Sequence, residues 1–254
     1  MRASAARGLT MPSEPHVRVF ADPKHLFHGG AEIFCDIGRR AIQQKGRFTI
    51  ALAGGSTPRG LHQELTTDFR SQLDWPNAFF FFGDERHVPP TDQESNYRMA
   101  KETLFLQLDI SPDHVFRIPA EIPDAGEAAQ AYQHTLREFF QVTTSSFPHL
   151  DLVLLGMGLD GHTASLFPGT TALEERHHWV VANWVERFSV FRITFTYPLL
   201  NNAENVLFLV SGGEKAEMVR RALKDPSANL PCQGVQPISG QLTWLLDQAA
   251  AAKL

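Results

Sequence analysis

The sequence predicts an α/β fold, with a doubly wound, mostly parallel sheet flanked by helices in a Rossmann-like arrangement. Short apolar runs bounded by Gly, Pro or Asn alternate with longer segments of helical period, which is typical of βαβ units. Two of the runs, AFFFF at 78–82 and LDLVLL at 150–155, are almost continuously hydrophobic. Strands of this kind suit a sheet that is covered on both faces.

Strands are expected where a short apolar run ends in turn-forming residues. In chain order the expected strands are His16–Phe20, Phe48–Ala53, Ala78–Phe82, Leu150–Leu155, Trp179–Val185, Arg192–Tyr197 and Asn205–Val210. We expect the part near residues 177–210 to form a small β-rich excursion from the main sheet.

Helices are expected between these strands, where apolar residues recur at helical spacing. The segment Ala125–Phe140 shows the pattern, because Ala128, Tyr132, Leu136 and Phe139 fall on one stripe of a helix. The other expected helices are Leu26–Gln44, Pro58–Phe69, Asn96–Leu108, Gly213–Leu223 and Gln241–Ala251.

The composition is that of one globular domain. The 254 residues are 43% hydrophobic and 20% charged, which excludes a disordered or fibrous chain. We expect a single α/β domain at 15–254, preceded by a flexible extension at 1–14 in which Met11 is an alternative natural start. The two cysteines, Cys35 and Cys232, form neither a disulfide framework nor a metal-ligand pattern, so no metal is expected.

The charge and hydropathy also limit the partners. A formal net charge of −5 gives no general attraction for nucleic acid, so an anionic ligand must be met by a local group of cations or N–H donors. No run approaches the roughly 18 apolar residues of a membrane span. We therefore expect a cytoplasmic protein with no nucleic-acid or membrane partner.

The first functional motif is the loop ALAGGSTPRG at 51–60. A buried strand runs into Gly54 and Gly55, and a helix follows for which Thr57 is the expected N-cap and Pro58 the first residue. The glycines allow close approach of an anion, and Ser56 and Thr57 add donors, so the loop suits phosphate. It matches neither nucleotide-binding glycine pattern. The alternative is a glycine-rich turn that binds nothing.

The second motif is FFFGDERHVPP at 80–90, which follows a buried strand. In open α/β sheets the ligand crevice lies beyond the carboxyl ends of the strands, where this motif falls. Arg86 is the natural anion partner, and Asp84 or Glu85 is expected to hold its guanidinium in place. The alternative is a solvated loop with an internal ion pair.

The third motif, LDLVLLGMGLDGHTASLFPG at 150–169, places Asp160 and His162 among glycines after another buried strand. A neutral imidazole can take a proton from water near neutral pH, and Asp160 could fix its tautomer or stabilise the cation. The hydroxyl of Ser165 is close in sequence, but the segment is not G-x-S-x-G, which argues against a serine esterase. The alternative for His162 is a surface or core histidine without a catalytic role.

The fourth motif, at 185–219, supplies three cations. Arg187 and Arg192 are expected just before a strand, and Lys215 at the start of a helix after Gly212 and Gly213. Each is a candidate phosphate ligand. The alternative is that they are surface charges at the ends of strands and helices.

Together the motifs resemble those of the 6-phosphogluconolactonase family, within the wider group that includes glucosamine-6-phosphate deaminases. The resemblance extends over nearly the whole chain from about Val17, in the order GGSTPRGL, FFFGDERHVPPTDQESNYRMA, DLVLLGMGLDGHTASLFPG and RITFTYPLLNNAENVLFLVSG. It implies hydrolysis of 6-phosphoglucono-1,5-lactone to 6-phosphogluconate in the oxidative pentose phosphate pathway, without metal or cofactor.

The resemblance also implies roles for individual residues. It makes His162 the base that activates water and Asp160 its partner, and it assigns Arg86 and the GGST loop to the phosphate. Related sequences usually carry a lysine a few residues before RIT, where this chain has Arg187, so the charge is kept and the shape is not. The implied partner is a sugar-phosphate lactone, and the chain is expected to be a monomer or a weak homo-oligomer.

Two other functions are alternatives to lactone hydrolysis. A sugar-phosphate deaminase would share the fold, but deaminases place a glutamate five residues after the histidine, where this chain has Phe167. A sugar-phosphate sensor of transcription regulators would need a DNA-binding module, and the segment before His16 is too short for a helix-turn-helix.

Overall fold

The computed structural model of the protein describes residues 15–142 and 146–254, so the expected extension at 1–14 lies outside the described residues. The main sheet has six strands in the order β1-β9-β8-β5-β2-β3, and every neighbouring pair is parallel. The strands are β1 (His16–Phe20), β2 (Phe48–Leu52), β3 (Ala78–Phe82), β5 (Leu152–Leu155), β8 (Asn205–Val210) and β9 (Gln241–Asp247).

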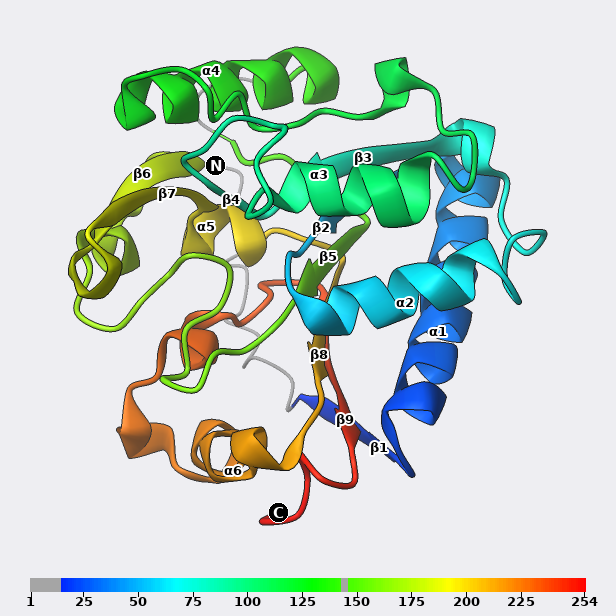
Figure 1. Ribbon diagram of the computed structural model, residues 1–254, viewed down its shortest axis with the longest axis vertical. Helices are drawn as coiled ribbons and strands as arrows, with labels where there is room; N and C mark the ends of the chain where they lie inside the picture. The colour runs from blue at the N-terminus through cyan, green and yellow to red at the C-terminus, as the bar shows by residue number, and fades with distance from the viewer. Residues whose placement is uncertain (1–14, 143–145) are drawn as a thin grey trace, which may run out of the picture.

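Helices cover both faces of this sheet. Figure 1 shows α1 and α2 on one side and α6 with the small second sheet on the other. The helices are α1 (Pro23–Lys45), α2 (Ser56–Thr66), α3 (Asn96–Ala100), α4 (Ala125–Phe140), α5 (Tyr197–Leu200) and α6 (Ala216–Lys224). The predicted doubly wound, mostly parallel α/β fold is therefore confirmed.

A second sheet of three antiparallel strands accounts for the predicted β-rich excursion. It has the order β4-β7-β6, with β4 at Asp84–Arg86, β6 at Val180–Val185 and β7 at Val190–Phe195. The short strand β4 was not predicted, because three charged residues in a row carry no alternating apolar pattern. It forms because the chain continues from β3 through Gly83 and pairs with β7.

Strands β2 and β3 are apolar along almost their whole length because both of their faces are buried. All five residues of β2 are buried, and so are four of the five residues of β3. The aromatic rings of β3 pack on neighbouring rings, with Phe81 stacked on Phe116 and Phe80 tilted against Phe105. These contacts fix the sheet on which the functional loops stand.

Several predicted boundaries are wrong. The segment Gln241–Ala251 was expected to be a helix, whereas Gln241–Asp247 is the strand β9, hydrogen-bonded between β1 and β8. The expected helix Asn96–Leu108 divides into α3 and one turn of π-helix at Lys101–Phe105. Arg192 lies within β7 rather than before it.

Among the helices at 15–142 and 146–254, none combines the length and the apolar character that crossing a membrane requires.

Candidate active site

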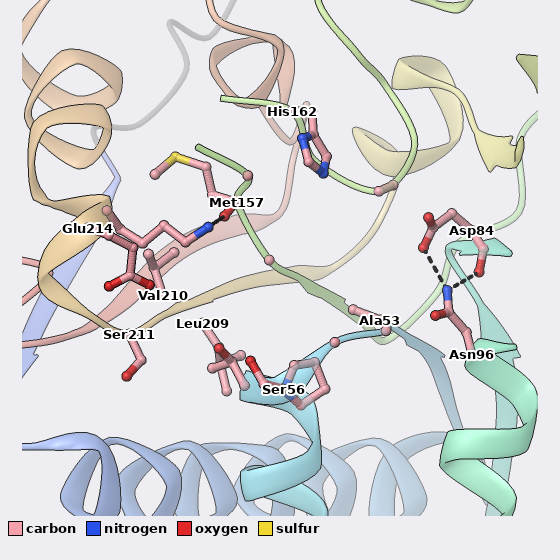
Figure 2. A pocket seen from close by; sticks show the side chains of 18 of the residues that line it. Ala53, Ser56, Asp84, Asn96, Met157, His162, Leu209, Val210, Ser211 and Glu214 are labelled. Carbon is pink, nitrogen blue, oxygen red and sulfur yellow. Dashed lines mark hydrogen bonds between the residues drawn. The ribbon is translucent and has the colours of Figure 1, made fainter. Parts of the chain in front are cut away.

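A cavity of about 340 Å³ opens beyond the carboxyl ends of β2, β5 and β8 (Figure 2). Its wall comes from the segments that follow those strands and from the β4 region. Of the residues singled out in the sequence, those that line it are Gly54, Gly55, Ser56, Thr57, Arg86, His162 and Lys215. Asp160, Arg187 and Arg192 lie outside this lining.

The glycine loop after β2 brings backbone close to the cavity. Gly55 has φ = 106°, a conformation that favours glycine, and a Cβ on Gly54 would fall 1.8 Å from Oδ1 of Asn96. The helix α2 begins at Ser56 with Gly55 as its N-cap, so the expectation of Thr57 as the N-cap is wrong. Within the described chain no side chain caps the first turn of α2, which leaves backbone N–H groups for an anion.

In the DER segment, Asp84 and Arg86 line the cavity, whereas Glu85 supports the neighbouring helix α3. Glu85 is buried and accepts hydrogen bonds from the backbone N–H groups of Asn96 and Tyr97 at 2.7 and 2.8 Å. Burial raises the pKa of Glu85, while these hydrogen bonds act in the opposite direction. Glu85 therefore anchors the start of α3 under the cavity.

Asp84 faces the cavity with both oxygens engaged. Its Oδ2 accepts a hydrogen bond from the Ser165 hydroxyl at 2.6 Å. Its Oδ1 accepts a hydrogen bond from the Asn96 amide at 3.2 Å, as Figure 2 shows. The guanidinium of Arg86 donates to the backbone carbonyl of Glu94. The expectation that Asp84 or Glu85 holds this guanidinium is therefore wrong.

The loop after β5 fixes the imidazole of His162. Its Nδ1 lies 2.5 Å from Oδ1 of Asp160, and a Cβ on Gly158 would fall 2.0 Å from the same nitrogen. Burial alone would raise the pKa of Asp160, but the hydrogen bonds and charge of His162 lower it. An ionised Asp160 accepts the Nδ1 proton, so the neutral ring has its free lone pair on Nε2. The sequence could predict this pair, because its two members are adjacent in one loop.

The three cations of the fourth motif lie in different surroundings. Lys215 lines the cavity and donates to the carbonyl of Met157 at 3.0 Å. Arg187 lies near Asp160, with its Nη1 3.1 Å from Oδ2 of Asp160, and lines a neighbouring cavity.

Arg192 stands opposite Arg86 in the pairing of β4 with β7. Burial lowers the pKa of Arg192, and the charge of Arg86 lowers it further. Within the described residues the Nε of Arg192 is buried without a hydrogen-bond partner. Two adjacent guanidinium groups of this kind favour an anion between or beside them.

The cavity wall also contains residues that were not predicted as site residues. Asn96 and Glu214 both line the cavity. Asn96 follows Ser95, the N-cap of α3, and only the tertiary contact with Asp84 shows that its side chain turns toward the cavity. A neutral amide in a polar segment carries no sequence signal for that contact.

A candidate metal-binding group lies elsewhere. In the described part of the chain, His28, Glu64 and Asp68 form the one group of three potential ligands close enough to hold an ion. His28 belongs to α1 and Glu64 to α2, Asp68 follows the end of α2, and none of the three lines the cavity.

Known proteins are similar to this chain over most of its length. The family described as glucosamine-6-phosphate isomerases/6-phosphogluconolactonase matches residues 21–244. A protein of Nostoc named 6-phosphogluconolactonase is 40% identical over 94% of this chain and 98% of its own length. One of the same name from Treponema pallidum is 41% identical over 82% of this chain and 87% of its own length.

Solved structures agree with the sequence matches. A 6-phosphogluconolactonase from Trypanosoma cruzi superposes with a TM-score of 0.86 at 30% identity, covering 96% of this chain and 98% of its own. The enzyme of that name from Trypanosoma brucei gives a TM-score of 0.85 at 31% identity, covering 95% and 99%. A monomeric glucosamine-6-phosphate deaminase, with a TM-score of 0.77, 24% identity and coverage of 94% and 100%, shares the fold.

Proposed function

The chain belongs to the glucosamine-6-phosphate isomerase/6-phosphogluconolactonase family, and we propose that it hydrolyses 6-phosphoglucono-1,5-lactone to 6-phosphogluconate with His162 as general base. The observation that carries the proposal is His162, which is bound to Asp160 and lines a cavity that also holds an uncapped helix start and two cations. His162 supplies the base, and the helix start and the two cations supply a binding place for a phosphate.

The chemistry needs little beyond these groups. A lactone is an ester whose carbonyl carbon is open to attack by water, so one positioned base and donors for the developing oxyanion suffice. Nε2 of His162 takes a proton from water as the water oxygen bonds to C1. Asp160 stabilises the imidazolium that forms.

The second half of the reaction uses the same proton. When the tetrahedral intermediate collapses, the bond between C1 and the ring oxygen breaks, and the imidazolium returns the proton to that oxygen. The products are the open-chain carboxylic acid and a neutral His162, so atoms and charges balance. No covalent enzyme intermediate, metal ion or cofactor takes part in this proposed sequence.

The phosphate has a separate set of partners. The backbone and hydroxyls of Ser56 and Thr57, together with Arg86, line the cavity, and Arg192 adds positive charge beside Arg86. Lys215 is the second cation on the cavity wall, after Arg86. This set supports a doubly charged phosphate at one end of the substrate and the lactone carbonyl near His162.

Lactone hydrolysis fits this site better than deamination does. The ring of Phe167 lies against the imidazole of His162. The resemblance implies that glucosamine-6-phosphate deaminases have a glutamate at this position. A phenyl ring neither accepts nor donates a proton. The product of this reaction would enter the oxidative pentose phosphate pathway. The cytoplasmic location of the protein stays a prediction, and so does its monomeric or weakly oligomeric state.

The test is the initial rate at which the purified protein hydrolyses 6-phosphoglucono-1,5-lactone. The lactone is generated in the assay, and the spontaneous rate of opening is subtracted. We expect the rate of hydrolysis to saturate with lactone concentration and to stay unchanged when a chelator is added. A rate equal to the spontaneous one at all protein concentrations would overturn it.

A further inference from the structure

A closed cycle of side-chain contacts includes the imidazole of His162. Starting from His162, the cycle passes through Asp160 to Arg187, and Arg187 lies over the ring of Phe188 at 4.5 Å from its centroid. Phe188 meets Phe167 edge to face at 6.0 Å, and Phe167 stacks on the imidazole at 4.1 Å. Two chain segments, 160–167 and 187–188, are thus connected by both an ionic and an aromatic contact.

Arg187 occupies a special place in this cycle. Its guanidinium is bound to Asp160 rather than directed into the cavity, which it does not line. Asp160 uses one oxygen for His162 and the other for Arg187. A cation on the second oxygen offsets part of the negative charge that Asp160 presents to the imidazole.

We propose that Arg187 is a positioning residue for the catalytic base: through Asp160 it orients His162 and limits how strongly the carboxylate favours the imidazolium. This inference rests on the proposed function for the identity of the base. It differs from the expectation that Arg187 binds phosphate. A base must be unprotonated to act, so a cation behind the carboxylate keeps His162 available at lower pH.

Four other charged side chains line the same cavity as His162, and they do not replace Arg187. On the cavity wall, two acidic and two basic side chains compensate each other in sign, and Asp160 with Arg187 forms the remaining pair. The four wall residues are Asp84, Arg86, Glu214 and Lys215. Removing Arg187 alone therefore leaves the charge of Asp160 without a partner cation.

The expected size of the effect is modest. The side chain of Arg187 is 63% exposed and that of Asp160 is 25% exposed, so solvent screens the pair in part. We expect Arg187→Gln to move the titration midpoint of His162 upward by about 0.5 pH unit. The acid limb of kcat/KM should move by the same amount with phosphorylated and unphosphorylated gluconolactone alike.

The experiment is an NMR titration of the His162 ring in the wild type, Arg187→Gln and Arg187→Lys, with the His162 signal assigned from its absence in His162→Asn. Arg187→Lys keeps the charge and should stay near the wild-type midpoint. Arg220→Ala is the matched control, because Arg220 forms an exposed ion pair with Glu217 on α6. It should leave the midpoint unchanged.

Two results would overturn the inference. One is an unmoved midpoint in Arg187→Gln, and the other is an equal shift in Arg187→Gln and Arg187→Lys. A rise in KM for the phosphorylated lactone alone, with the midpoint unmoved, would return Arg187 to the phosphate. The NMR titration requires no turnover, so failure of lactone hydrolysis in the wild type would count against the proposed function and leave this test intact.

Discussion

The ring of Phe167 lies nearly parallel to the imidazole of His162, with their planes 25° apart and their centroids 4.1 Å apart. Phe167 is 7% exposed, so its ring is held in the interior beside the base. The stack fixes one face of the imidazole and fills the space that a second proton-transferring side chain would need.

We therefore predict no measurable release of ammonia from glucosamine 6-phosphate under conditions in which the phosphorylated lactone is hydrolysed. Opening an aminosugar ring and isomerising it requires a partner for His162 that Phe167 does not provide. The measurement is an ammonia assay with both substrates at equal protein concentration. Phe167→Glu should not create a deaminase, because the remaining wall is unchanged. Ammonia release at a rate comparable with lactone hydrolysis would disprove the functional assignment.

Arg86→Ala should lower kcat/KM for the phosphorylated lactone by about 10- to 100-fold. That is the scale of one lost charge-assisted hydrogen bond, about 1.5–3 kcal/mol. Unphosphorylated gluconolactone should be affected much less. Steady-state kinetics with both substrates measure the difference, and Arg220→Ala serves as the control for loss of a surface cation. Equal losses on both substrates would remove Arg86 from the phosphate role.

The free energy of unfolding should decrease as the pH is lowered, because of His62. This residue of α2 is completely buried, its Nδ1 lies 2.8 Å from Oγ1 of Thr103, and its Nε2 has no partner within the described residues. Burial, and then the charge of Arg59, lower the pKa of His62 from 6.5 to about 3. In the unfolded chain His62 therefore gains a proton near pH 6.5, whereas in the folded chain His62 stays neutral until about pH 3.

The free energy of unfolding should decrease between pH 6.5 and pH 3, by up to about 1.4 kcal/mol per pH unit from His62 alone. Urea unfolding at a series of pH values measures this slope. His62→Leu should flatten it, since leucine does not titrate and the Thr103 hydroxyl keeps its bond to the Met99 carbonyl. His134→Gln, at an exposed site on α4, is the control. Parallel slopes in the wild type and His62→Leu would show that His62 is not responsible.

Treatment with a chelator should leave lactone hydrolysis unchanged. The proposed reaction uses His162 and water, and the candidate metal ligands His28, Glu64 and Asp68 do not line the cavity. The assay compares initial rates before and after prolonged dialysis against EDTA. Activity that disappears and returns on adding a divalent ion would contradict the prediction.

The fold was predictable from the sequence where buried strands are continuous apolar runs. The runs at β3 and β5 indicated a parallel sheet, and the glycine motifs after β2 and β5 indicated which strand ends carry the site. The segment 241–247 could not be assigned in the same way. Its apolar residues Leu242, Trp244, Leu245 and Leu246 suit a helix as well as a buried strand, and only pairing with β1 and β8 selects the strand.

The site was predictable within single loops and not between them. The contact of Asp160 with His162 joins neighbours in sequence, and the cavity brings His162, Arg86, Lys215 and the GGST loop together. The partner of Arg187 lies 27 residues away, in another loop, and the position of Arg192 opposite Arg86 depends on the register of β4 with β7. Such pairs depend on tertiary packing, which periodicity does not encode.

The role of His162 as general base is tested most directly by the turnover rate of His162→Asn on 6-phosphoglucono-1,5-lactone, with the spontaneous reaction subtracted. Loss of a general base should lower kcat by about 10²- to 10⁴-fold and change KM little. His134→Gln, an exposed histidine on α4, should keep the wild-type rate. A His162→Asn protein that folds normally and turns over the lactone at a near wild-type rate would contradict the assignment of His162 as the base.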